Sequence, residues 1–100
     1  MHEGHRKRLK ERYLREGLEG FQDHEVLELL LYYSIPRKDT NEIAHRLLKR
    51  FGSLVAVLEA EPSELEKVES IGAHSALLLS LIPAISRRYA LASFGSRPQL

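Results

Sequence analysis

The sequence contains no cysteine, and only four prolines and six glycines among its 100 residues. Without cysteine the chain has neither a disulfide framework nor a thiolate zinc site, and this is typical of a cytoplasmic protein. No apolar run reaches the length required to cross a bilayer, and no signal-peptide pattern opens the chain. We therefore expect a cytoplasmic location and no membrane partner.

Strand patterns are also missing. No segment alternates apolar and polar residues with a period of two, and β-branched residues are few. Apolar residues recur instead at helical spacing, which predicts an all-α fold, a compact bundle of about five to six helices. The expected helices cover residues 5–16, 25–33, 40–51 and 54–58, then a fifth from Pro62 that includes Val68, and a sixth over 73–89 or beyond.

Local signals define the ends of these helices. Asp23, Asp39 and Ser53 are expected N-caps, Gly52 a C-terminal stop, and Pro62 a first-turn residue. The apolar faces predict a single core. Its expected members are Leu29, Leu30, Leu47, Leu48, Leu65, Val68, Ile71, Leu78 and Leu79, and Leu9, Tyr13 and Leu14 are expected to face inward from the first helix.

Catalytic patterns are absent as well. The five histidines are scattered, with no His-x-His or His-Glu-x-x-His spacing, and neither a Ser/His/Asp arrangement nor a glycine-rich phosphate loop is recognisable. We therefore expect no enzymatic activity in this chain, no metal site and no required cofactor.

The charges are unevenly distributed although the net charge is only +1. Residues 1–16 hold six Lys or Arg against three Glu, whereas residues 59–69 hold five Glu against Lys67. A basic end and an acidic middle indicate directional electrostatics. Cations along the first helix suit a phosphodiester backbone because each guanidinium can bridge two phosphate oxygens. The candidates are Arg6, Arg8, Lys10 and Arg12, and a solvated helix face is the alternative.

A second pair of cations, Arg37 and Lys38, precedes the third helix. These side chains are candidates for phosphate contact at an exposed helix start. The alternative is an ordinary capped turn, since Asp39 already occupies that helix start.

The segment 65–79 is the most informative, because it reads as helix, tight turn and helix. Backbone N–H groups at the start of the second helix have no intrahelical partner, and a phosphate is able to approach a glycine closely. The candidate DNA-binding residues are Ser70, Ile71, Gly72, Ala73 and His74. The segment resembles the helix–hairpin–helix motif of non-sequence-specific DNA-binding proteins, in which a glycine usually stands where this chain has Ser70. The alternative is an ordinary two-helix corner.

Several ordered blocks within residues 2–90 resemble the amino-terminal region of the RadC family, which is named for bacterial DNA repair. The blocks are Gly4-His-Arg-x-Arg-Leu, Phe21-x-Asp-His-Glu-x-Leu-Glu-Leu-Leu-Leu, Ile35-Pro-Arg-Lys-Asp-Thr-Asn and Leu47-Leu-x-Arg-Phe-Gly-Ser. The resemblance implies a helix–hairpin–helix domain over 1–93, with 94–100 starting a linker to a metallopeptidase-like domain of the JAB/MPN type. The zinc motif of that domain does not occur here. The resemblance also implies an optional monovalent cation at the hairpin.

These observations lead to two hypotheses. The first is a DNA-binding module that contacts the phosphate backbone without sequence preference. The second is a protein-interaction module that docks a partner or positions a carboxy-terminal hydrolase domain, which the acidic stripe of residues 59–69 would suit. The sequence does not determine whether the nucleic acid is DNA or RNA, which nucleic-acid structure is preferred, what the oligomeric state is, or whether the turn with Ser70 holds phosphate.

Overall fold

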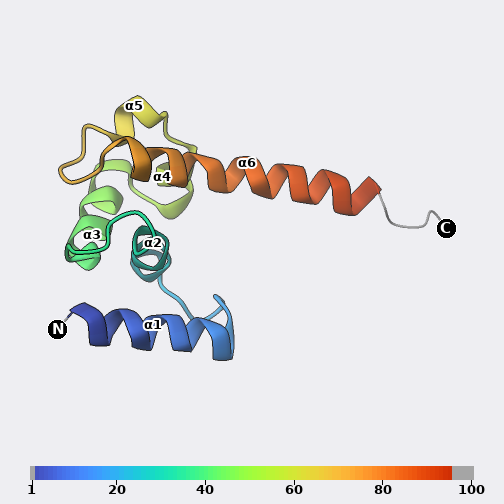
Figure 1. Ribbon diagram of the computed structural model, residues 1–100. Helices are drawn as coiled ribbons and strands as arrows, with labels where there is room; N and C mark the ends of the chain where they lie inside the picture. The colour runs from blue at the N-terminus through green and yellow to red at the C-terminus, as the bar shows by residue number, and fades with distance from the viewer. Residues whose placement is uncertain (1, 96–100) are drawn as a thin grey trace.

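The computed structural model describes residues 2–95, and within that range it is built from six helices and no strand. The helices are α1 (His2–Glu16), α2 (Asp23–Leu31), α3 (Thr40–Phe51), α4 (Leu54–Glu59), α5 (Pro62–Leu65) and α6 (Ala73–Gly95). The all-α prediction is confirmed. Figure 1 shows α1 lying beside α2 at one side of the bundle and α6 projecting from the opposite side.

Most of the predicted helix ends are confirmed. The Asp39 carboxylate accepts a hydrogen bond from the Asn41 backbone N–H at 3.0 Å and caps α3, and the Ser53 hydroxyl caps α4. Gly52 ends α3 with a φ of 100°, a left-handed conformation that glycine adopts without steric cost. Pro62 opens α5. Short-range chemistry therefore sets these boundaries.

The start of α2 and the end of α5 differ from the prediction. Gln22, not Asp23, is the N-cap of α2, because the Glu25 carboxylate accepts from the Gln22 backbone N–H at 2.9 Å in a capping box. Asp23 is the first residue of the helix. The α5 helix ends at Leu65, and turns carry the chain through Val68, which is nevertheless buried.

The core lies between α2, α3, α4, α5 and the first turns of α6. Its fully buried centre comprises Leu27, Leu31, Leu47, Val57, Leu65 and Leu79. Of the expected core residues, five are buried: Leu47, Leu65, Val68, Ile71 and Leu79. The other four, Leu29, Leu30, Leu48 and Leu78, are half-buried. Leu30 and Leu48 still pack against the buried core. Leu29 and Leu30 also line an open groove, so one side of α2 is not fully covered.

Helix α1 is attached differently from the other helices. Leu9 is buried, but Tyr13 and Leu14 are exposed, which corrects the expectation that both face inward. The reason is that Tyr13 and Leu14 border an open groove, where no helix packs over them, whereas Leu9 is enclosed where α1 packs on the bundle. Polar contacts therefore carry much of the attachment of α1.

Helix α6 runs through Pro83 to Gly95, in agreement with the predicted extent of 73–89 or beyond. It covers 94–95 of the expected linker, and 96–100 lie outside the described residues. By length and composition alone, α6 is long and apolar enough to cross a membrane. This corrects the expectation that no apolar segment reaches that length. Its first turns pack on α4 and α5, and its second half carries Arg87 and Arg88.

Candidate nucleic-acid interface

The turn between α5 and α6 is held by Ile71. The Ile71 side chain is buried, and its backbone N–H donates to the Val68 carbonyl at 3.0 Å. The preceding residue, Ser70, has a φ of 76°, in the left-handed region that costs a non-glycine residue about 1–2 kcal/mol. The geometry at this position therefore favours glycine, and Ser70 adopts it under strain.

Gly72 leaves the surface of this turn open. A Cβ at Gly72 would have no heavy atom within 4 Å, and its φ lies outside the left-handed region. Packing within the described residues therefore gives no reason for a glycine here. The first intrahelical bond of α6 runs from the Ala76 N–H to the Gly72 carbonyl at 3.0 Å, so the N–H groups of residues 73–75 have no intrahelical acceptor. Ala73 and His74 are exposed.

Lys38 comes close to this turn from the loop between α2 and α3. Its Nζ lies 3.4 Å from the Ser70 hydroxyl oxygen, although the two residues are 32 positions apart. Arg37 is exposed beside it. The two predicted candidate regions, 37–38 and 70–74, are thus brought together into one surface, which supplies the cation that the turn itself lacks.

Arg6 secures the other side of that loop. Its guanidinium donates to the carbonyls of Ile35 at 2.7 Å and Lys38 at 2.9 Å, and more weakly to that of Tyr32 at 3.4 Å. It also lies 4.6 Å from the centre of the Tyr32 ring. The sequence interpretation placed Arg6 outward for phosphate, whereas the structure uses its donors to fix the loop that carries Lys38.

Arg12 is likewise committed within the protein. Its two terminal nitrogens bind the Glu25 carboxylate at 2.9 and 3.0 Å, one of them also donates to the Gly20 carbonyl, and the group lies over Phe21. The hydrogen bond from Arg12 is the main reason that the pKa of Glu25 falls to about 2, and the Gln22 N–H contributes next. Arg12 therefore joins α1 to the start of α2.

The other two candidate cations of α1, Arg8 and Lys10, are exposed but lie elsewhere. The Arg8 guanidinium folds back beside Gly4 on its own helix. The Lys10 Nζ lies 5.3 Å from the centre of the Tyr33 ring, at the edge of the groove. Neither residue lines the small pocket beside the Ser70 turn.

Sequence reasoning missed Arg46 on α3. Its guanidinium binds the Glu42 carboxylate at 2.8 Å and lies 3.6 Å from that of Glu69, beside the candidate turn. Arg46, Lys38 and Ser70 share a shallow pocket of about 210 Å³ between α3 and the turn. The spacing of Glu42 and Arg46, four residues apart in a helix, was the available signal, but their proximity to residue 70 is non-local.

Three of the five carboxylates of the acidic stripe lie near cations. Glu64 binds Lys67 at 2.8 Å and Arg50 at 3.0 Å, and mainly the Lys67 hydrogen bond lowers the pKa of Glu64. Glu59 lies 3.8 Å from Arg87, and Glu69 is near Arg46 as described. The stripe therefore repels phosphate less than its count of carboxylates suggests.

Three histidines, His5, His24 and His45, make contacts between helices. His5 lies 3.0 Å from the buried Glu28 carboxylate, and the rings of His24 and His45 stack with centres 4.5 Å apart. Among residues 2–95 no group of three His, Cys, Asp or Glu side chains is arranged to hold a metal ion.

Comparison with known proteins gives the family. The model of the UPF0758 N-terminal family matches residues 3–77. A UPF0758 protein of Fusobacterium nucleatum is 44% identical over 80 residues, covering 80% of this chain and 34% of its own length. A UPF0758 protein of Rhodobacter capsulatus is 39% identical over 92 residues, covering 92% and 43%. The chain thus spans less than half the length of these relatives, and no solved structure matches it. It belongs to the UPF0758 family, through that family's N-terminal domain.

Proposed function

We propose that this domain binds DNA through the phosphate backbone without reading sequence, using the Ser70–His74 turn together with Lys38 and Arg37. The observation that carries the proposal is the position of Lys38, whose ammonium lies beside Ser70 at the start of α6. A cation adjacent to unpaired backbone donors provides both charge and hydrogen bonds for one phosphate group. The resemblance to the RadC family and its helix–hairpin–helix motif agrees with this role in bacterial DNA repair.

The openness of Gly72 supports the same role. Because a side chain at residue 72 would extend into solvent, the glycine has no internal packing purpose, whereas close approach of a phosphate requires a bare backbone. The strained Ser70 conformation is part of the same turn. The structure also limits the contact, since Arg6 and Arg12 are bound within the protein. Because fewer cations are left to contact phosphate than the sequence predicted, we expect a modest affinity for DNA.

Salt-titrated binding tests this proposal. With about two to three phosphates neutralised, log affinity for duplex DNA falls with log salt at a slope of roughly −2 to −3, equally for unrelated sequences. The Arg37→Ala/Lys38→Ala double variant flattens the slope by about one unit per lost contact. Lys49→Ala is the matched control, because Lys49 is exposed near the opposite end of α3 and its loss leaves slope and affinity unchanged.

Gly72→Val separates backbone contact from charge. A Cβ at residue 72 would meet no heavy atom within 4 Å, and a melting curve of the variant verifies that the domain stays folded. Affinity then drops while the salt slope stays, because the blocked donors are uncharged amides. Duplex, single-stranded and branched DNA and duplex RNA, measured in parallel, identify the preferred structure. No binding to any of them at low salt, or full binding by both variants, would refute the proposal.

The alternative is a docking module that positions a metallopeptidase-like domain. Its electrostatic support is the acidic stripe, in which Glu59, Glu64 and Glu69 lie within 4 Å of a cation and Glu61 and Glu66 are exposed. A cytoplasmic location, a chain without enzymatic activity, and no cofactor beyond an optional monovalent cation at the turn stay predictions of the proposal.

A further inference from the structure

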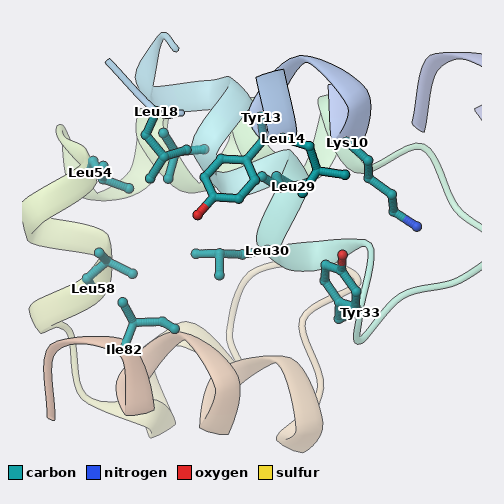
Figure 2. Close-up of a pocket in the computed structure, with 11 residues that line it drawn as sticks. Lys10, Tyr13, Leu14, Leu18, Leu29, Leu30, Tyr33, Leu54, Leu58 and Ile82 are labelled. Atoms are coloured by element: carbon teal, nitrogen blue, oxygen red, sulfur yellow. The ribbon is translucent and has the colours of Figure 1, made fainter. Parts of the chain in front are cut away.

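An apolar groove opens between α1, α2, α4 and α6, on a different part of the molecule from the Ser70 turn. Its volume is about 570 Å³, and Leu14, Leu18, Leu30, Leu58 and Ile82 are among the residues that line it. Figure 2 shows the lining side chains around the space from several helices, with Tyr13 among the leucines and Tyr33 at one edge. Its single charged lining residue is Lys10. A groove of this size and polarity suits an apolar helix face.

The second half of α6 has the opposite geometry, a free helix with apolar side chains. This half of α6 projects from the bundle (Figure 1), and Ile85, Tyr89, Leu91 and Phe94 are all exposed. None of the buried residues of α6 lies in this half, since they are Ser75, Ala76 and Leu79. A monomer therefore exposes a free apolar helix and an open apolar groove at once.

The groove and the projecting helix form one continuous apolar surface. Ile82 lines the groove, and Ile85 and Tyr89 follow it at positions i+3 and i+7, on the same side of the helix. The exposed parts of Tyr33 (71%) and Tyr89 (73%) amount to roughly 290 Å² at about 200 Å² per ring. The exposed aliphatic side chains of the same surface, Leu14 (81%), Leu18 (45%) and Ile85 (52%), bring this toward the roughly 800 Å² that each partner buries in a stable dimer.

We propose that this chain forms a two-fold dimer in which residues 81–94 of each copy's α6 lie in the groove of the other copy. One symmetric interface then covers both surfaces, whereas an unrelated helix in the groove would leave the projecting half of α6 exposed. The charges allow this arrangement. Lys10 lies at the rim beside Tyr33, and Arg87 lies 3.8 Å from Glu59 of its own chain, so neither has to be buried unpaired. Arg88 is exposed and lies about 100° around the helix from Tyr89, so its guanidinium can stay in solvent at the rim.

The absence of cysteine allows a direct test. One chain carrying only Leu14→Cys is mixed with a differently tagged chain carrying only Ile85→Cys, so that every disulfide between the two tags is intermolecular. Mild oxidation is expected to give the mixed disulfide dimer as the main product. The pair Val55→Cys and Ile85→Cys is the control, because Val55 is exposed on α4 outside the groove. Equal cross-linking of the control pair would overturn the proposal.

Sedimentation of the full 100-residue chain completes the test. The parent shows a concentration-dependent monomer–dimer equilibrium, and Leu14→Glu and Ile85→Glu each weaken it by roughly 10-fold to 100-fold because a carboxylate enters an apolar interface. Val55→Glu leaves it unchanged, and melting curves verify that all variants are folded. A parent that stays monomeric at its highest soluble concentration would overturn the proposal, whether α6 then binds lipid vesicles or the groove accepts a helix of another protein.

Discussion

The cations near the amino terminus and those of the α2–α3 loop differ in what holds them. Arg6 and Arg12 direct their guanidinium groups into the protein, onto backbone carbonyls and the Glu25 carboxylate. Arg37 and Lys38 point to solvent, and the contact of Lys38 with the Ser70 hydroxyl is long, at 3.4 Å. The first pair builds the domain, and the second pair is free to bind a ligand. Charge alone does not distinguish these roles.

The two sets are nevertheless connected. Arg6 donates to the main-chain carbonyl of Lys38, so an arginine of the structural set positions a lysine of the binding set. If this division is correct, changes in the first set lower stability, and changes in the second alter binding without altering stability. The following predictions test the division, in order of decreasing effect on the unfolding free energy.

Arg6→Ala is expected to destabilise the domain by about 2–3 kcal/mol, because it leaves the Ile35 carbonyl and its neighbours without a charged donor and removes packing on Tyr32. Urea unfolding followed by circular dichroism measures the change. Arg8→Ala, two positions along the same helix, is the control and should shift stability by less than about 0.5 kcal/mol. Equal effects of the two variants would erase the distinction between them.

Arg12→Ala is expected to cost about 1–2 kcal/mol at neutral pH, since it removes a two-point bond to the Glu25 carboxylate. The pH dependence sharpens this. The folded-state pKa of Glu25, about 2, lies below its ordinary 4.5, so its contribution is complete above pH 4.5 and is lost as the pH falls toward 2. In the variant the remaining Gln22 contact preserves only part of that acid sensitivity. If the stability of the variant fell between pH 5 and pH 2.5 by as much as that of the parent, this would contradict the role of Arg12.

Features that depend on neighbouring residues could be predicted from the sequence, whereas features that depend on contacts between distant residues could not. The caps at Asp39 and Ser53 and the stop at Gly52 depend on neighbouring residues, and they were predicted correctly. The bonds of Arg6 span 26 to 32 residues, so helical spacing could not reveal them. The half-burial of Leu29 and Leu30 likewise depends on a groove that only the packing of four helices creates.

Ser70→Gly is expected to stabilise the domain by about 1 kcal/mol, because it relieves the left-handed strain at φ 76°. The gain is smaller than the full strain because glycine also raises the entropy of the unfolded chain. Thermal unfolding measures it, with Ser63→Gly as a control that removes an exposed serine without a positive φ. The change should leave the binding cations in place, so DNA affinity should not fall. A loss of stability would show that the Ser70 hydroxyl matters more than its backbone strain.

Lys38→Ala is expected to change the unfolding free energy least, by less than about 0.5 kcal/mol, although Lys38 lies beside both Ser70 and Arg6. Arg6 binds the carbonyl of residue 38, which alanine keeps, and the side-chain contact is long and exposed. The same variant should lose DNA affinity and flatten the salt slope by about one unit. Parallel urea titrations of Lys38→Ala and Arg6→Ala provide the comparison. If Lys38→Ala unfolded as readily as Arg6→Ala, the lysine would be a structural residue, and the division between building and binding cations would fail at this loop.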